Sequence, residues 1–166
     1  MNVALIDTGP MVALFDASDV AHRHYTSLLA DNWRLTTTWP CVVEVCHFLG
    51  ANAVQRFLRW VSEGGVIVYP FDVSNLPDLA ELMARYTTPP RSEMDLADAT
   101  LVWLAQDTNT LSVMTMDVRD FSRYRLPDGR CFEILLACQA QISSCRTCGM
   151  ELPLHNAALW PKPSPY

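Results

Sequence analysis

The stretch EMDLADATLVWLAQ, residues 93–106, decides how the rest of the chain is interpreted. Its apolar residues recur at helical spacing, which predicts a helix with most of its surface buried. Asp95 and Asp98 nevertheless stand in its first turns, three residues apart and therefore on one face of that helix. Carboxylates beside a buried helix face need a physical reason, because an unpaired buried carboxylate is costly.

The sequence around this helix alternates between short strand-like runs and longer helix-like segments. Strands alternating with helices of this length indicate βαβ units, so we expect an α/β fold with a mostly parallel central sheet flanked by helices on both faces. Strands are predicted at residues 3–7, 34–39, 66–71, 111–117 and 131–137, and helices at 9–17, 21–31, 40–50, 54–65, 76–86 and 93–106.

Composition bounds the class of protein. The 166 residues are 50% hydrophobic and 18% charged, which indicates a globular chain. We expect one domain over residues 1–137 and an appended tail over the Pro-rich residues 138–166. No apolar run is long enough to span a bilayer, and the first residues, MNVALIDTG, lack the basic region of a signal peptide. The expected location is therefore cytoplasmic, without a membrane partner.

The charge pattern is acidic with one basic strip. A net charge of −6 normally argues against nucleic acid, because phosphate is repelled. Four arginines nevertheless lie close together after residue 118, and arginine suits bidentate phosphate contacts. The strip consists of Arg119, Arg123, Arg125 and Arg130. An acidic chain with such a strip remains compatible with a phosphate-bearing substrate, and Arg119, Arg123 and Arg125 are the candidate phosphate contacts.

Acidic residues gather where a parallel sheet would bind a ligand. Such sheets bind ligands outside the carboxyl ends of their strands. Asp7 ends the first predicted strand and Asp117 the fourth, while Glu44 lies one turn inside the helix after the second. Asp95 and Asp98 open the helix of residues 93–106. We therefore expect five acids from four separated segments at one edge of the sheet.

Each acid also has a local explanation. Asp7 could simply cap the next helix, and Asp95 could be a first-turn residue favoured by the helix dipole. Asp117 could be a turn residue, with Asp120 as its more exposed neighbour. A local role in capping or in the helix dipole explains Asp98 less well. It explains Glu44, which lies in a Val-rich turn, least well.

Taken together, the acids point to a cation. The chain has a single lysine, Lys162 in the tail, and no arginine lies inside the apolar segments. Carboxylates about 4–5 Å apart repel by roughly 3–4 kcal/mol per pair at an effective dielectric near 20. Such a cluster persists only if it is protonated or binds cations, and oxygen ligands alone suit Mg²⁺ or Mn²⁺.

Four sequence pieces, in order, resemble a PIN-domain ribonuclease and more narrowly a VapC-like toxin of a toxin–antitoxin pair. They are ALIDTGPMVALFD, PCVVEV, MDLADATLVWLA and TMDVRDFSRYRL, and they span roughly residues 1–137. The resemblance implies Mg²⁺- or Mn²⁺-dependent cleavage of RNA and inhibition by an antitoxin protein. It implies metal-binding acids at Asp7, Glu44, Asp98 and Asp117, an additional acid at Asp95, and small hydroxyl residues near the site at Thr8 and Thr115.

Other functions fit the sequence less well. Receiver-type phosphoacceptor modules and haloacid-dehalogenase-like phosphatases also place acids at strand ends, but both need a lysine that only Lys162 could supply. The remaining alternative is a PIN-like RNA- or protein-binding module with little or no nuclease activity.

Two features stay open. Trp60 and Trp103 could belong to a homodimer interface or an antitoxin groove, or equally to the core. In the tail, Cys138, Cys145, Cys148 and His155 could bind zinc, although one CxxC with scattered partners is a weak signal beside a plain appended segment.

Overall fold

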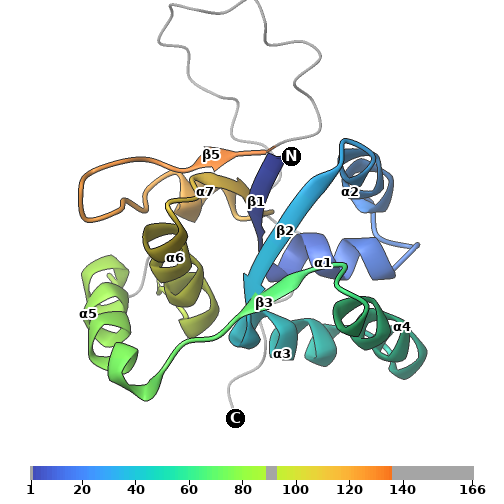
Figure 1. The fold of residues 1–166 in the computed structure, drawn as a ribbon, viewed down its shortest axis with the longest axis horizontal. Coiled ribbons are helices and arrows are strands. Elements are labelled where there is room, and N and C mark those ends of the chain that lie inside the picture. The colour runs from blue at the N-terminus through green and yellow to red at the C-terminus, as the bar shows by residue number, and fades with distance from the viewer. Residues whose placement is uncertain (1, 89–92, 136–166) are drawn as a thin grey trace, which may run out of the picture.

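The computed structural model describes residues 2–88 and 93–135. In this part of the chain, five strands form one sheet in the order β3-β2-β1-β4-β5, and every neighbouring pair is parallel (Figure 1). The predicted α/β class with a parallel sheet is confirmed. The strands are β1 (Asn2–Ile6), β2 (Trp33–Thr38), β3 (Ile67–Tyr69), β4 (Ser112–Met114) and β5 (Glu133–Ile134).

The helices form two layers around the sheet, as expected. Helices α1 to α4 lie on one side of β1 and β2, and α5 and α6 lie on the other (Figure 1). Right-handed crossovers explain this division, because the chain steps from β1 to β2 to β3 in one direction and then crosses back to β4. The helices are α1 (Thr8–Phe15), α2 (His22–Leu29), α3 (Trp39–Phe48), α4 (Ala51–Ser62), α5 (Leu76–Tyr86), α6 (Leu96–Thr108) and α7 (Val118–Phe121), with a short 3₁₀ turn η1 (Val73–Asn75).

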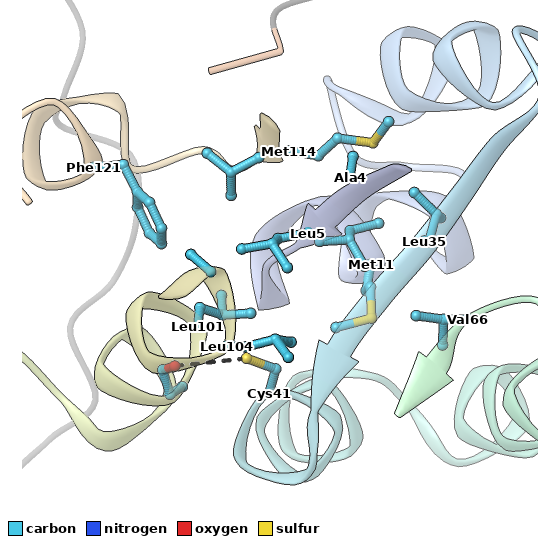
Figure 2. Close-up of a cluster of buried hydrophobic side chains, with 14 of the residues drawn as sticks. Ala4, Leu5, Met11, Leu35, Cys41, Val66, Leu101, Leu104, Met114 and Phe121 are labelled. Atoms are coloured by element: carbon cyan, nitrogen blue, oxygen red, sulfur yellow. Dashed lines mark hydrogen bonds between the residues drawn. The ribbon is translucent and has the colours of Figure 1, made fainter. Parts of the chain in front are cut away.

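The core lies where β1 meets the two helical layers. Leu5 of β1 and Leu101 of α6 are fully buried, and so is Met11 of α1 (Figure 2). Helix α6 is apolar around most of its circumference because it packs between the sheet and α5. Since β1 and α6 are both held rigidly, the residues at their ends have defined positions.

Several predicted boundaries differ from the structure. The strand expected at residues 111–117 ends at Met114, because the chain then turns into α7, a helix that was not predicted. Asp117 starts this helix, since its side chain accepts a hydrogen bond from the backbone N–H of Asp120. Trp39 begins α3 and does not end a strand. The last strand is shorter than expected and covers Glu133–Ile134.

Trp60 and Trp103 pack against the body of the protein. The Trp60 ring lies 5.4 Å from the ring of Phe15, and the Trp103 ring lies 6.1 Å from that of Tyr69. Both tryptophans are half-buried against the core, which favours the core alternative for them. A homodimer remains a prediction.

The predicted domain boundary after residue 137 and the tail cysteines lie outside the described residues. No helix within residues 2–88 and 93–135 is long and apolar enough to cross a membrane.

Candidate active site

The site lies where the strand order reverses. From β1 the chain continues to β2 on one side, whereas from β4 it continues to β5 on the other. In open parallel sheets, the carboxyl ends of the strands at such a reversal form the crevice in which ligands bind. Asp7 follows β1, and its N–H donates to the carbonyl of Met114 at the end of β4 (3.0 Å). The hydroxyl of Thr115 donates to Oδ2 of Asp7 (2.8 Å). The fold therefore joins two predicted site residues that are distant in sequence.

Asp7 caps helix α1 and also lies at the crevice. Its Oδ1 accepts the backbone N–H of Thr8 (2.6 Å), so the expected capping role is real. The residue is only 9% exposed. Burial raises the pKa of Asp7 to about 6, although the hydrogen bonds from Thr115 and Thr8 act in the opposite direction, and the charges of Asp95 and Glu44 add to the rise.

Glu44 reaches the same edge from α3. Its Oε2 accepts a hydrogen bond from the hydroxyl of Thr8 (2.8 Å), the residue next to Asp7. Burial raises the pKa of Glu44 above its usual range, against the hydrogen bond from Thr8, and the charge of Asp95 adds to this. The structure thus brings together Asp7, Thr8, Glu44 and Thr115.

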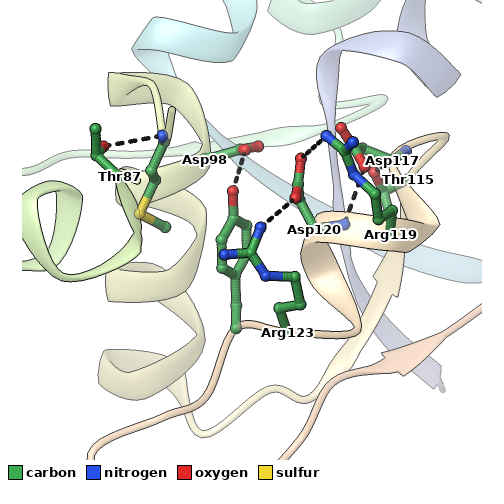
Figure 3. A network of polar contacts seen from close by, with 9 residues as sticks. Thr87, Asp98, Thr115, Asp117, Arg119, Asp120 and Arg123 are labelled. Atoms are coloured by element: carbon green, nitrogen blue, oxygen red, sulfur yellow. Dashed lines mark hydrogen bonds and ion pairs between the residues drawn. The ribbon is translucent and has the colours of Figure 1, made fainter. Parts of the chain in front are cut away.

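Asp95 and Asp98 play different parts at the start of α6. Asp95 is exposed and caps the helix, because its Oδ1 accepts the backbone N–H of Asp98 (2.8 Å). Asp98 is half-buried, and its Oδ2 accepts the hydroxyl of Tyr124 (2.8 Å; bond to Asp98 in Figure 3). Burial, followed by the charges of Asp7 and Asp95, raises the pKa of Asp98 to about 9, while the Tyr124 hydrogen bond opposes the rise. Local capping accounts for Asp95 but not for Asp98.

The capping role of Asp95 can be tested by two substitutions. Asp95→Ala removes the side-chain acceptor and should lower the free energy of unfolding by about 1 kcal/mol, whereas Asp95→Asn keeps an acceptor and should cost much less. Urea unfolding of the two variants beside the wild type measures the difference. Equal destabilisation by alanine and asparagine would contradict the capping role.

Asp117 and Asp120 correct one expectation from the sequence. Asp117 is exposed, whereas Asp120 is only 6% exposed, so their expected order of exposure was wrong. The reason is that Asp120 accepts hydrogen bonds from Arg119 and Arg123, each at 3.0 Å, which stabilise its buried charge (Figure 3). Burial alone would raise the pKa of Asp120, but these two arginines outweigh it and the pKa is lowered. The N–H of Asp117 donates to the Thr115 hydroxyl (3.0 Å), which ties α7 to the crevice.

The predicted phosphate contacts are engaged within the chain. Arg119 and Arg123 bind Asp120, and Arg125 donates to the backbone carbonyls of Ser122 and Tyr124 (2.7 Å each). The Arg119 side chain is still 68% exposed. A guanidinium carries five donors, so Arg119 can bind a phosphate while it holds Asp120.

Neutral groups hold the acids of the crevice. The hydroxyls of Thr115, Thr8 and Tyr124 donate to one carboxylate each. Among ion pairs between described residues, none involves the four acids predicted to bind metal, namely Asp7, Glu44, Asp98 and Asp117. A hydroxyl fixes a carboxyl group without forming an ion pair with it, so the oxygen donors of these acids remain available to Mg²⁺ or Mn²⁺. Within residues 2–88 and 93–135, no three acidic, His or Cys side chains are already arranged as a complete metal-binding group.

Tyr124 contacts a predicted site residue, and sequence reasoning missed it. Its position between arginines in SRYRL gave no helical or strand periodicity, and a tyrosine there is equally typical of core packing. The residue is 1% exposed, and only the fold shows that its hydroxyl reaches a carboxylate on α6.

A separate cavity of about 460 Å³ lies at the end of α1 and the start of α4. None of the predicted site acids lines it. Its walls include Phe15, Asp16, Phe48, Ala51 and Arg56. The acid crevice is thus an open edge of the sheet and not part of this cavity.

Comparisons with known proteins agree with this architecture. No known family model matches the chain. Its sequence is 25% identical over 136 residues to ribonuclease VapC26 of Mycobacterium tuberculosis, covering 79% of this chain and 98% of the relative.

Two solved structures share the fold. The crystal structure of Mycobacterium tuberculosis VapC20, described as a sarcin–ricin loop cleaving toxin, has a TM-score of 0.62 at 18% identity and covers 72% of this chain and 92% of its own. That of VapBC2 from Rickettsia felis, bound to a DNA fragment from its promoter, has a TM-score of 0.54 at 17% identity and covers 80% of this chain and 98% of its own.

The parallel sheet, its strand order and the similar structures define a PIN-domain fold. Together with the ordered sequence motifs, the similarity to VapC26 supports a narrower likeness, to the VapC-like PIN-domain proteins.

Proposed function

We propose that the chain is a metal-dependent endoribonuclease that acts as the toxin of a toxin–antitoxin pair. The observation that supports the proposal is the set of acids at one sheet edge. The carboxylates of Asp7, Glu44 and Asp98 each accept a hydroxyl. The Asp117 carboxylate accepts a backbone N–H, from Asp120. The description of VapC26 as a ribonuclease and of VapC20 as a sarcin–ricin loop cleaving toxin supports the reaction class.

The four carboxylates would have different roles in the reaction. Asp7 and Asp98 would hold a Mg²⁺ or Mn²⁺ ion directly, and Glu44 and Asp117 would complete the set or orient a water molecule. A divalent cation supplies Lewis acidity, which favours deprotonation of water and offsets charge on a phosphoryl oxygen. Because the pKa values of Asp7 and Asp98 are raised to about 6 and about 9, both carboxyls must release protons before they can act as ligands.

The remaining predicted residues would support the same reaction. Thr115 holds Asp7 and Thr8 holds Glu44, so each fixes a carboxylate in place. Asp95 keeps α6 capped and adds negative charge beside Asp98. Arg119, assisted by Arg123 and Arg125, would contact phosphates flanking the cut.

The partners follow from the proposed role. The substrate would be RNA, met in the cytoplasm, and a cognate antitoxin would inhibit the nuclease. The structure of VapBC2, with a similar fold, supports a protein partner of this kind. A homodimer is also part of the proposal.

Removing the metal tests the reaction class. The purified protein, incubated with a pool of structured RNAs, should cleave in Mg²⁺ or Mn²⁺, stop cleaving in EDTA and recover when Mn²⁺ is restored in excess. Gel electrophoresis of end-labelled RNA measures this. RNA binding without cleavage at every metal concentration would favour the alternative of a PIN-like binding module.

A further inference from the structure

We propose that Tyr124 is a positioning residue of the candidate metal site: its hydroxyl fixes one oxygen of Asp98 and leaves the other available to a divalent cation. This inference rests on the proposed function. The Tyr124 hydroxyl donates to Oδ2 of Asp98 (2.8 Å). Oδ1 of Asp98 makes no hydrogen bond to any described residue.

The ring of Tyr124 is held from two sides. It packs edge-on against Phe121 of α7 and Tyr86 of α5, with ring centroids 5.3 and 5.0 Å away. The backbone beside it is fixed as well, because the N–H of Arg125 donates to the Tyr86 hydroxyl (2.9 Å). A buried ring with these contacts has little rotational freedom, so its hydroxyl is presented to Asp98 in one position.

A tyrosine suits this task better than a cation. A buried arginine or lysine in its place would neutralise Asp98 and compete with a metal ion, whereas a phenol donates one hydrogen bond and remains neutral. The hydrogen bond from Tyr124 also joins the chain after α7 to α6. It thereby fixes the position of Asp98 relative to Asp117, at the start of α7.

The test compares two tyrosines with the same chemistry. Tyr124→Phe removes only the hydroxyl and retains the packed ring. Tyr69→Phe is the matched control, because the Tyr69 hydroxyl also donates to an aspartate of α6 at 2.8 Å, Asp107, at the far end of the helix. For each protein we would measure the Mn²⁺ dissociation constant by calorimetry without RNA, kcat and KM for RNA cleavage, and the unfolding temperature.

Tyr124→Phe should weaken Mn²⁺ binding about tenfold and lower kcat by about 10- to 100-fold, with the KM for RNA little changed, because partners of metal ligands contribute effects of this size. Tyr69→Phe should leave these quantities at wild-type values. In addition, Tyr124→Phe should have no further effect on Mn²⁺ affinity when Asp98→Asn is already present, if Tyr124 acts through Asp98.

Each other outcome contradicts the inference. If the wild type binds Mn²⁺ and cleaves RNA while Tyr124→Phe behaves like Tyr69→Phe, the positioning role is wrong and the proposed function stands. If Tyr124→Phe fails to fold, the hydroxyl serves the fold and not the site. If the wild type neither binds Mn²⁺ nor cleaves RNA, the proposed function fails and the inference fails with it.

Discussion

Replacing Asp98 by asparagine is expected to slow RNA cleavage at least about a thousandfold while leaving the protein folded. Asparagine removes the negative charge but keeps the shape of the side chain, and its carbonyl oxygen can still accept the hydroxyl of Tyr124. The backbone N–H at position 98 that binds Asp95 is unchanged, so α6 stays capped. Losing about 4 kcal/mol of transition-state stabilisation by a misplaced or absent cation corresponds to this factor.

Asp107→Asn provides the matched control. Asp107 lies on the same helix and also accepts a tyrosine hydroxyl, from Tyr69, but it is remote from the crevice. Single-turnover cleavage rates, Mn²⁺ affinity and thermal unfolding should be measured for both variants. Asp98→Asn cleavage within tenfold of the wild type would remove Asp98 from the reaction, and an equal loss in Asp107→Asn would show that the effect is not specific to the crevice.

A helix-capping role of the acids is compatible with the metal-binding role proposed for them. Asp7, Asp95 and Asp117 are the N-cap residues of α1, α6 and α7, respectively. The amino ends of these helices therefore face the same sheet edge, and their partial positive charge stabilises nearby carboxylates. A sequence argument that treats a helix cap and a metal ligand as competing interpretations misses that one residue can be both.

Repeated patterns in the sequence predicted elements of the fold, whereas contacts that form only on folding left no pattern in the sequence. The apolar spacing of residues 93–106 predicted α6, and the positions of Asp7 and Glu44 after predicted strands placed them at one edge. The hydrogen bond of Tyr124 to Asp98 spans two segments without any local signal. The burial of Asp120 was predicted wrongly because its two arginine partners come from the same short segment, where charged residues normally indicate an exposed turn.

Without a divalent cation, the protein should become less stable as the pH rises from about 4 to about 9. Asp7 and Asp98 have folded-state pKa values of about 6 and about 9, above the ordinary 3.8. The folded state therefore binds more protons than the unfolded state in this range, so the free energy of unfolding falls as pH increases. For Asp7 alone the shift corresponds to about 3 kcal/mol, lost mainly between about pH 4 and pH 6, and Asp98 extends the loss towards pH 9.

Urea unfolding in EDTA and in Mg²⁺, at intervals from pH 5 to pH 9, measures this dependence. Mg²⁺ should stabilise the protein most at high pH, because a cation binds the charged carboxylates of the folded state and not the unfolded chain. Asp98→Asn should flatten the EDTA profile above about pH 6, since the group that titrates there is gone, and should reduce the effect of Mg²⁺. A free energy of unfolding that rises with pH in EDTA would mean that burial and mutual repulsion do not disfavour the charged acids in the folded protein, and the electrostatic basis of the metal site would be lost.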